Sequence, residues 1–229
     1  MRHGLMSVEI KPIAHIITDF PEKFGIPRQA GIVDALEGRI VFEKEYRSAE
    51  ALRGIEGFSH LWLIWQFSAS VRDGWSPTVR PPRLGGNERM GVFATRSPFR
   101  PNSLGLSCVK LLGVDYDAPD GPVITVSGAD MMSGTPIFDI KPYIPYADCK
   151  EGALSGFAPD AGRKLRVIIP PELEERIPAD KRAPLAGVLE NDPRPRYQKD
   201  TQRVYAMDFA GMTVRFTGDA DTIRVVGIE

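Results

Sequence analysis

The sequence of 229 residues is long enough for one or two domains that each bury an apolar core. Hydrophobic residues make up 42% and charged residues 26%, a composition that excludes a largely disordered chain. The formal net charge of -1 excludes a strong overall basic field, so a nucleic-acid partner would have to bind a local patch. The two cysteines and the lack of an N-terminal signal peptide predict reduced thiols in a cytoplasmic protein.

The first two-thirds of the chain has the pattern of short β-strands. Apolar and polar residues alternate over residues 8–17 and 39–46, whereas residues 59–68 are almost continuously apolar and suit a strand buried on both faces. Short strands at this spacing, with few helical periods between them, predict a closed or nearly closed β-barrel. Further strands of the series are expected at residues 90–95, 106–117, 123–130 and 136–143.

The composition changes near residue 150, where glycine, aspartate and small residues indicate a linker. We therefore predict a mainly β chain with a β-barrel domain at residues 1–150 and a small α+β domain at residues 151–229. In the second domain, helices are expected from Pro171 and within residues 179–189. The tail predicts two or three strands, with hairpin turns at residues 209–212 and 217–219.

Two smaller expectations concern local structure in the barrel domain. Residues 49–53 are expected to form a short helix with Ser48 as its N-cap. His60 lies among apolar residues and is interpreted as a hydrogen-bonded structural histidine. The sequence also lacks a Rossmann glycine motif, a P-loop, a nucleophile elbow and a local metal-binding motif.

The most informative segment is residues 80–102, RPPRLGGNERMGVFATRSPFRPN. It carries five arginines against one acid, together with four prolines that stiffen its backbone. Arginines on rigid loops lose less entropy on binding, and their planar forks suit carboxylates or phosphates. A solvated basic loop is the alternative, although such loops more often use lysine and serine. The arginines are Arg80, Arg83, Arg89, Arg96 and Arg100.

Two further segments place polar groups on turns. Residues 23–31 present an arginine fork and an amide directly after Pro27, on a loop between two expected strands. Residues 130–143 contain a tight turn into a strand, with Asp139 and Lys141 on one strand face. That pair is either a structural ion pair or a functional one, and the sequence favours neither interpretation.

The last segment, DPRPRY at residues 192–197, follows the second expected helix. A helix-terminating turn explains Asp192 and the proline after it but leaves Arg194 and Tyr197 unexplained. An arginine that meets phosphate and a tyrosine that stacks on a base are typical of proteins that read single-stranded nucleic acid.

Together these segments resemble the TsaA/TrmO family, the tRNA (N6-threonylcarbamoyladenosine(37)-N6)-methyltransferases. The resemblance runs essentially end to end, and the RSPFRPN and DIKPY runs are its most specific parts. It rests on PRQ at 27–29, EGFSHLW at 56–62, the segment at 80–102, SGTPIFDIKPYIPYAD at 133–148 and DPRPRY at 192–197.

The resemblance implies a barrel that binds S-adenosylmethionine without metal, works as a homodimer and differs from the Rossmann methyltransferases. It also implies that the C-terminal domain engages the tRNA anticodon loop carrying N6-threonylcarbamoyladenosine (t6A) at position 37. The implied catalytic residues are Asp192 as general base or orienting acceptor, Arg194 on phosphate or the threonyl carboxylate, and Tyr197 on the base. The implied cofactor-binding residues are Pro27, Arg28, Gln29, Ser68, Ala69, Arg96, Leu106, Met131, Met132, Ser133 and Gly134.

Two positions depart from the family pattern. Ser133 stands where the family commonly has aspartate, and Ser68 stands where it commonly has histidine. Both border the implied cofactor site, so these contacts are expected to run through backbone atoms or to alter the affinity. The DPRPRY motif is intact.

Two alternatives remain open at this point. The barrel is also compatible with a module that senses S-adenosylmethionine without transferring its methyl group, which the near-neutral net charge favours. Hydrolysis of S-adenosylmethionine would likewise need only the barrel. If the domains divide the work as the resemblance implies, a chain truncated near residue 150 should still bind the cofactor.

Overall fold

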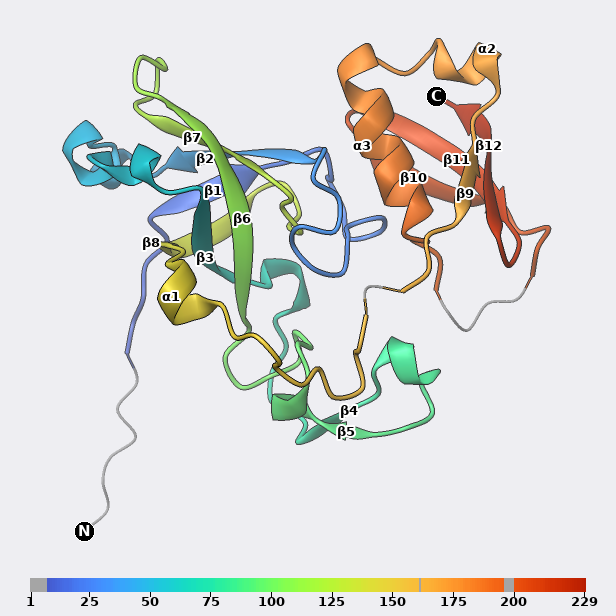
Figure 1. Cartoon of the computed structure of the whole chain (residues 1–229), viewed down its shortest axis with the longest axis horizontal. Helices are drawn as coiled ribbons and strands as arrows, with labels where there is room; N and C mark the ends of the chain where they lie inside the picture. The colour runs from blue at the N-terminus through green and yellow to red at the C-terminus, as the bar shows by residue number, and fades with distance from the viewer. Residues whose placement is uncertain (1–7, 161, 196–199) are drawn as a thin grey trace.

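A computed structural model describes residues 8–160, 162–195 and 200–229 and divides into a barrel and a smaller α+β body (Figure 1). The barrel is closed by six strands in the order β1-β2-β7-β6-β3-β8, and each neighbouring pair is antiparallel. The predicted mainly β fold class is therefore confirmed. Its strands are β1 Ala14–Ile17, β2 Glu37–Phe42, β3 His60–Gln66, β6 Leu104–Asp115, β7 Val123–Ser127 and β8 Thr135–Pro142.

Strand β3 shows how the barrel sorts its side chains. Leu61, Leu63 and Trp65 are buried in the interior, whereas the residues between them are only half-buried. Successive side chains of a strand point to opposite faces, so one face fills the core while the other lies outside. The prediction that this strand is buried on both faces is wrong, because its outer face is covered only in part. On that face Trp62 lies 5.9 Å from the ring of Tyr143.

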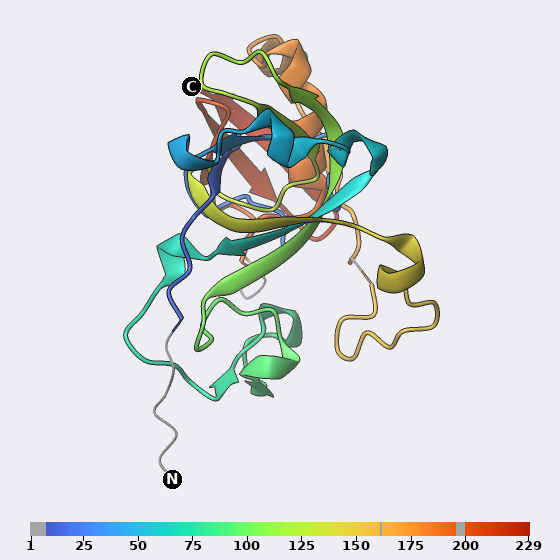
Figure 2. The same cartoon turned by 90° about the vertical axis from the view of Figure 1, so that its left-hand side faces the viewer.

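The arginine-rich segment belongs to an arm that extends away from the barrel (Figures 1 and 2). Strands β4 Thr78–Val79 and β5 Met90–Gly91 pair across it. The strand predicted at residues 90–95 covers only those first two residues, because the chain continues as a 3-10 turn at Val92–Ala94. A second 3-10 turn at Pro82–Leu84 carries Arg83.

The C-terminal body holds a four-stranded sheet in the order β10-β11-β12-β9, in which β12 and β9 are parallel. The predicted helices, three tail strands and two hairpin turns are present, whereas the short strand β9 and helix α1 were not predicted. Helix α1 Pro145–Asp148 lies beside the barrel, where Oδ2 of Asp148 accepts a hydrogen bond from Nε1 of Trp62 at 3.1 Å (Figure 1). The elements of the C-terminal body are β9 Arg166–Ile168, α2 Pro171–Glu174, α3 Ala179–Glu190, β10 Tyr205–Phe209, β11 Met212–Gly218 and β12 Thr222–Ile228.

Several local expectations can be compared directly with the structure. The expected helix near residue 50 is a 3-10 helix at Ala49–Leu52, and Ser48 occupies its N-cap position as predicted, although its side chain makes no capping hydrogen bond. His60 bonds to the hydroxyl of Ser59 at 2.9 Å, as expected for a structural histidine. Asp139 and Lys141 form an ion pair at 3.0 Å. Within the described ranges, no helix is long and apolar enough to cross a membrane.

The loop at residues 18–36 joins the two bodies, because its apolar side chains complete the core of the C-terminal body. Phe20, Val33 and Leu36 are buried in that core, and the ring of Phe20 lies 5.3 Å from that of Phe209. At the start of the loop, Asp19 accepts a hydrogen bond from the amide of Ala210 at 2.8 Å through its backbone oxygen. A barrel loop is thus fixed by the second domain.

Candidate functional site

The segments predicted to bind the cofactor meet around the loop at residues 18–36. The side-chain oxygen of Gln29 accepts a hydrogen bond from Nη1 of Arg96, although the two are 67 positions apart. The amide of Gly31 donates to the carbonyl of Gly128 at 2.9 Å, which holds the loop against the end of β7. The PRQ loop, the arm and the segment after β7 are therefore brought together.

Other contacts attach the remaining predicted segments to the same loop. Thr18 donates from its hydroxyl to the carbonyl of Met131 at 3.0 Å, and the amide of Ser133 donates to the carbonyl of Phe20 at 2.8 Å. Nζ of Lys23 donates to the carbonyl of Ala69, beside Ser68. Ser133 contacts this loop through both its backbone and its side chain, because its hydroxyl also accepts from the amide of Thr18 at 3.4 Å. How Ser133 and Ser68 contact the cofactor stays a prediction from the sequence.

A buried polar chain that sequence reasoning missed supports this cluster. Nε1 of Trp65 donates to the hydroxyl of Ser107 at 2.9 Å, and that hydroxyl donates to Oδ1 of Asp130 at 2.6 Å. Burial raises the pKa of Asp130 above its ordinary value, while the bond from Ser107, the amide of Ala30 and the charge of Arg96 lower it. The cluster therefore keeps a costly, partly desolvated carboxylate beside an arginine.

The chemistry of these groups fits S-adenosylmethionine. The cofactor carries a positively charged sulfonium and amino group, a carboxylate, and a flat adenine with apolar faces. The cluster offers the carboxylate of Asp130 and the guanidinium of Arg96. Leu106, also predicted to bind the cofactor, is exposed on the face of β6 opposite to that of the buried Ser107. The turn before β8, where Gly134 has a φ of 81°, adds backbone groups.

Residues 192–195, the described part of the DPRPRY segment, follow α3, and among them Arg194 holds Asp192. Nε of Arg194 lies 2.7 Å from Oδ1 of Asp192, and Nη2 lies 3.2 Å from Oδ2. Nη2 also donates to the carbonyl of Asp219 at 2.7 Å, and Nη1 donates to that of Gly218. The turn is thus tied to the β11–β12 hairpin.

These contacts decide what Arg194 is free to do. Its side chain is only 13% exposed, and all three of its nitrogens bond to protein oxygens. Hydrogen bonding to Asp192 is the main cause of the raised pKa of Arg194. Asp192 has a left-handed backbone with a φ of 50°, a strained conformation for a non-glycine residue. Tyr197 lies outside the described residues.

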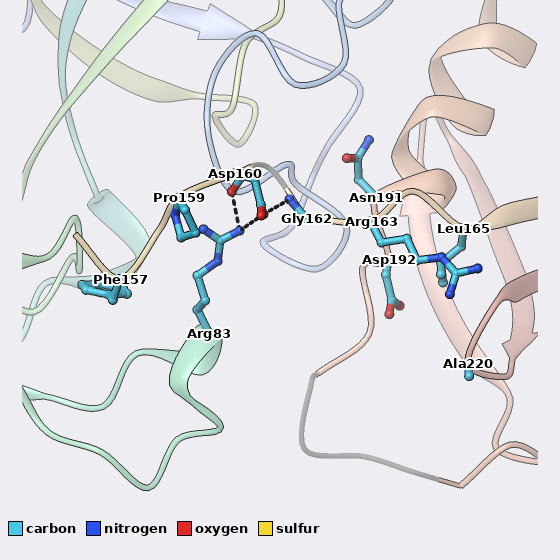
Figure 3. A pocket seen from close by; sticks show the side chains of 10 residues that line it. All are labelled: Arg83, Phe157, Pro159, Asp160, Gly162, Arg163, Leu165, Asn191, Asp192 and Ala220. Atoms are coloured by element: carbon cyan, nitrogen blue, oxygen red, sulfur yellow. Dashed lines mark hydrogen bonds and ion pairs between the residues drawn. The ribbon is translucent and has the colours of Figure 1, made fainter. Parts of the chain in front are cut away.

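A pocket of about 410 Å³ joins this turn to the arm (Figure 3). Asn191 and Asp192 lie on one side of it, and Arg83 reaches it from the arm on the other side. Sequence reasoning did not single out Arg83 from its four neighbouring arginines, and only the folded arrangement places it opposite Asp192. The remaining lining residues are Phe157, Pro159, Asp160, Gly162, Arg163, Leu165 and Ala220.

Comparison with known proteins agrees with this arrangement. Residues 15–149 match the family model of the tRNA-methyltransferase O N-terminal domain, and residues 163–229 match that of the TrmO C-terminal domain. A tRNA (adenine(37)-N6)-methyltransferase of Escherichia coli is 40% identical over 234 residues, which cover 98% of this chain and 99% of the relative.

Two further relatives match different lengths of the chain. A crystal structure of TrmO from Pseudomonas aeruginosa superposes with a TM-score of 0.80 at 31% identity, over 98% of this chain and 99% of that one. A probable S-adenosyl-L-methionine-binding protein of Pyrococcus abyssi is 36% identical over 155 residues, 68% of this chain and 78% of the relative. As its motifs predicted, the chain belongs to the tRNA-methyltransferase O (TrmO) family.

Proposed function

We propose that this chain transfers a methyl group from S-adenosylmethionine to N6 of t6A at position 37 of tRNA, giving N6-methylated t6A. Membership of the family, with both of its domains matched, makes the chain an S-adenosylmethionine-dependent tRNA methyltransferase. The restriction to t6A in an anticodon loop is the finer part of the proposal. It is carried by the fixed carboxylate of Asp192, which lines a pocket large enough for a modified base.

The cofactor, when bound, supplies an electrophilic methyl carbon on its sulfonium. The protein's own contribution is to place N6 in line with that carbon, and positioning of this kind supplies much of a rate enhancement. N6 of t6A is urea-like and weakly nucleophilic, so removal of its proton favours attack. Asp192 would accept that proton or orient the N–H group as the new N–C bond forms and the S–C bond breaks.

Arg194 acts in this mechanism through Asp192. Because its guanidinium is held by Asp192 and by the β11–β12 hairpin, we assign it a positioning role in place of the expected contact with phosphate or the threonyl carboxylate. A fork on both carboxylate oxygens fixes their orientation, as catalysis by a positioned acceptor requires. For Tyr197, stacking on the base or hydrogen bonding to it stays a prediction from the sequence.

In the barrel we propose that the predicted cofactor residues bind S-adenosylmethionine, with Asp130 added to them. Arg96 would bind the cofactor carboxylate, held in place by Gln29. Asp130 would face the positive charge of the cofactor, which offsets the cost of its own desolvation. Residues 1–150 would thus bind the cofactor, and residues 151–229 would engage the tRNA.

We also propose a cytoplasmic homodimer. The sequence also suggested exposed apolar surface near Trp62, Trp65 and Trp75 as a reason for a dimer. This is wrong for two of the three, because Trp65 is only 5% exposed and Trp62 is half-buried. Support comes instead from Trp75 and Phe93, which are exposed on the arm with their rings 6.0 Å apart, and from Leu106, which is exposed on the outer face of β6. Exposed apolar side chains that gather on one surface are typical of protein interfaces.

The proposal is tested by mass spectrometry of tRNA nucleosides after incubation with S-adenosylmethionine. Methylated t6A is expected with t6A-containing tRNA, and no product is expected from the same tRNA carrying unmodified adenosine. The Asp192, Arg194 and Tyr197 triple-alanine variant should bind the cofactor normally by calorimetry yet form no product. Full methylation by that variant would move the catalytic groups elsewhere.

The alternative is a module that binds S-adenosylmethionine without transfer, and the Pyrococcus abyssi relative is named only for binding. That module would bind the cofactor while methylating no t6A-containing tRNA. The same experiment therefore separates the two functions.

A further inference from the structure

The pocket between the arm and the C-terminal turn carries opposite charges on facing walls. Arg83 is the middle residue of the 3-10 turn Pro82–Leu84 in the arm, and Asp192 lies across the pocket in the turn after α3 (Figure 3). Asn191 adds an amide beside Asp192. A ligand that fits must therefore present an acceptor to one wall and a donor to the other.

Arg83 is already arranged to bind a carboxylate. Its Nη2 lies 3.2 Å from Oδ1 of Asp160 and also donates to the Asp160 carbonyl. The Arg83 side chain is 22% exposed, whereas that of Asp160 is 73% exposed. An exposed aspartate competes weakly for a guanidinium, so a ligand carboxylate can replace it at little cost.

The other arginine of the pocket is a poorer candidate. Arg163 pairs with Asp221 at 2.6 Å, and its side chain is 73% exposed to solvent. Charge pairs weaken as solvent access increases, because water screens them. Arg83 is the better-shielded fork, and its described contacts all run through one nitrogen, to Asp160.

We infer that Arg83 is the residue that selects a base carrying an amino-acid carboxylate, by binding that carboxylate while Asp192 accepts from the N–H group of the nitrogen that is methylated. This inference rests on the proposed function and assigns the two ends of its substrate to two walls of one pocket. A threonylcarbamoyl group has this pattern, because a urea N–H and a free carboxylate lie a few bonds apart. Unmodified adenine lacks the carboxylate and leaves Arg83 without a ligand.

The test uses three anticodon stem-loop RNAs that differ only at position 37. One carries t6A, the second carries t6A whose carboxylate has been converted to a methylamide, and the third carries adenosine. With wild type, the amide should lower kcat/KM by about 10- to 100-fold relative to t6A, since a charged hydrogen bond is lost. In the Arg83→Gln variant, kcat/KM for the t6A RNA should fall to the level that wild type shows with the methylamide RNA. For the methylamide RNA itself, the variant should lower kcat/KM little further.

The matched control is Arg89→Gln, which removes one charge from the same arm. Arg89 bonds to Thr78 within the arm at 3.1 Å and does not line the described pocket. This variant should still distinguish the carboxylate from the amide as wild type does. Affinity for the adenosine stem-loop, measured by filter binding, should be the same in Arg83→Gln and Arg89→Gln.

Two results would overturn the inference. If Arg83→Gln discriminates between acid and amide as strongly as wild type, then Arg83 does not read the carboxylate. If it weakens the adenosine stem-loop as much as the t6A stem-loop, then Arg83 binds a backbone phosphate. The absence of any transfer to t6A by wild type would instead contradict the proposed function itself.

Discussion

Arg96 in the arm and Arg194 in the C-terminal turn come from similar arginine-proline contexts, yet the structure uses them in opposite ways. Arg96 is exposed and bonds to the side chain of Gln29. Arg194 is 13% exposed, and its three nitrogens all bond to oxygens of the protein. The guanidinium of Arg96 remains accessible to a ligand, whereas that of Arg194 holds neighbouring segments of the protein together.

The difference shows what an arginine-proline sequence pattern can predict and what it cannot. Prolines around an arginine indicate that the backbone is stiff, but they do not indicate whether the fork faces solvent or another segment. The partners of Arg194 are the carbonyls of Gly218 and Asp219, more than twenty positions away. Only the docking of the β11–β12 hairpin decides that Arg194 positions Asp192.

Truncation after residue 150 should produce the largest effect, because it removes the whole C-terminal domain that contains Arg194. The barrel has its own core and should still fold, but Phe20, Val33 and Leu36 would lose their packing, worth roughly 1.5–3 kcal/mol each. Because the PRQ loop lies between these residues, its affinity for S-adenosylmethionine should fall at least about tenfold. Calorimetry on the truncated and full chains measures the change.

This expectation differs from the simple division of labour that the sequence suggested, in which the truncated barrel keeps its cofactor. Gly187→Ala offers a milder control in the full chain, since its new Cβ would lie 2.6 Å from Cγ1 of Val33. That variant should weaken cofactor binding in the same direction but less. Unchanged affinity in the truncated barrel would show that the loop is held by the barrel alone.

Exchanging each arginine for alanine sharpens the comparison at single residues. Arg194→Ala should lower the free energy of unfolding by about 2–4 kcal/mol, because it leaves partly buried oxygens without donors. Arg96→Ala should change that free energy by no more than about 0.5 kcal/mol, while weakening S-adenosylmethionine binding about tenfold. Urea unfolding and calorimetry on both variants separate the two effects.

A lysine at position 194 should restore little, because it lacks the planar fork that meets both oxygens of Asp192. Methylation by Arg194→Lys is therefore expected to stay far below wild type even if stability partly recovers. If Arg96→Ala and Arg194→Ala lowered the free energy of unfolding equally, the distinction between a ligand-accessible and a structural arginine would be wrong.

The fold was largely predictable because most barrel strands can be recognised locally, from alternating apolar residues or a short apolar run between turn residues. The sequence could not show which hydrophobic core buries the apolar residues that lie in loops. Phe20, Val33 and Leu36 were a signal, since three large apolar side chains in a polar loop need a core to bury them. Which core they enter depends on a domain that begins over a hundred residues later.

The candidate site shows the same limit. Gln29 and Arg96 were both predicted, and the structure joins them. Asp130 was not singled out, because an aspartate after a strand is typical of an ordinary turn. Its importance appears only when β6 brings Ser107 to 2.6 Å from it and the arm brings the charge of Arg96 nearby.

The smallest expected effect concerns the pH dependence of folding stability that Asp130 causes. Since burial raises its pKa, the folded protein holds this proton more tightly than the unfolded chain does. Below the unfolded pKa, about 4, both states are protonated and the carboxyl costs nothing. As pH rises through the folded pKa, the unfolded state loses its proton first, so stability falls and then levels off.

Asp130→Asn removes this titration while keeping an oxygen that can accept from Ser107. The variant should match wild type in unfolding free energy near pH 4 and exceed it by on the order of 1 kcal/mol at neutral pH. In an Arg96→Ala background the gain should be larger, because the arginine no longer offsets the buried charge. Urea unfolding from pH 4 to 8 measures both differences, and S-adenosylmethionine affinity should fall in Asp130→Asn although its fold is more stable. A variant that is destabilised at neutral pH, or that binds the cofactor as tightly as wild type, would show that Asp130 serves the barrel and not the site.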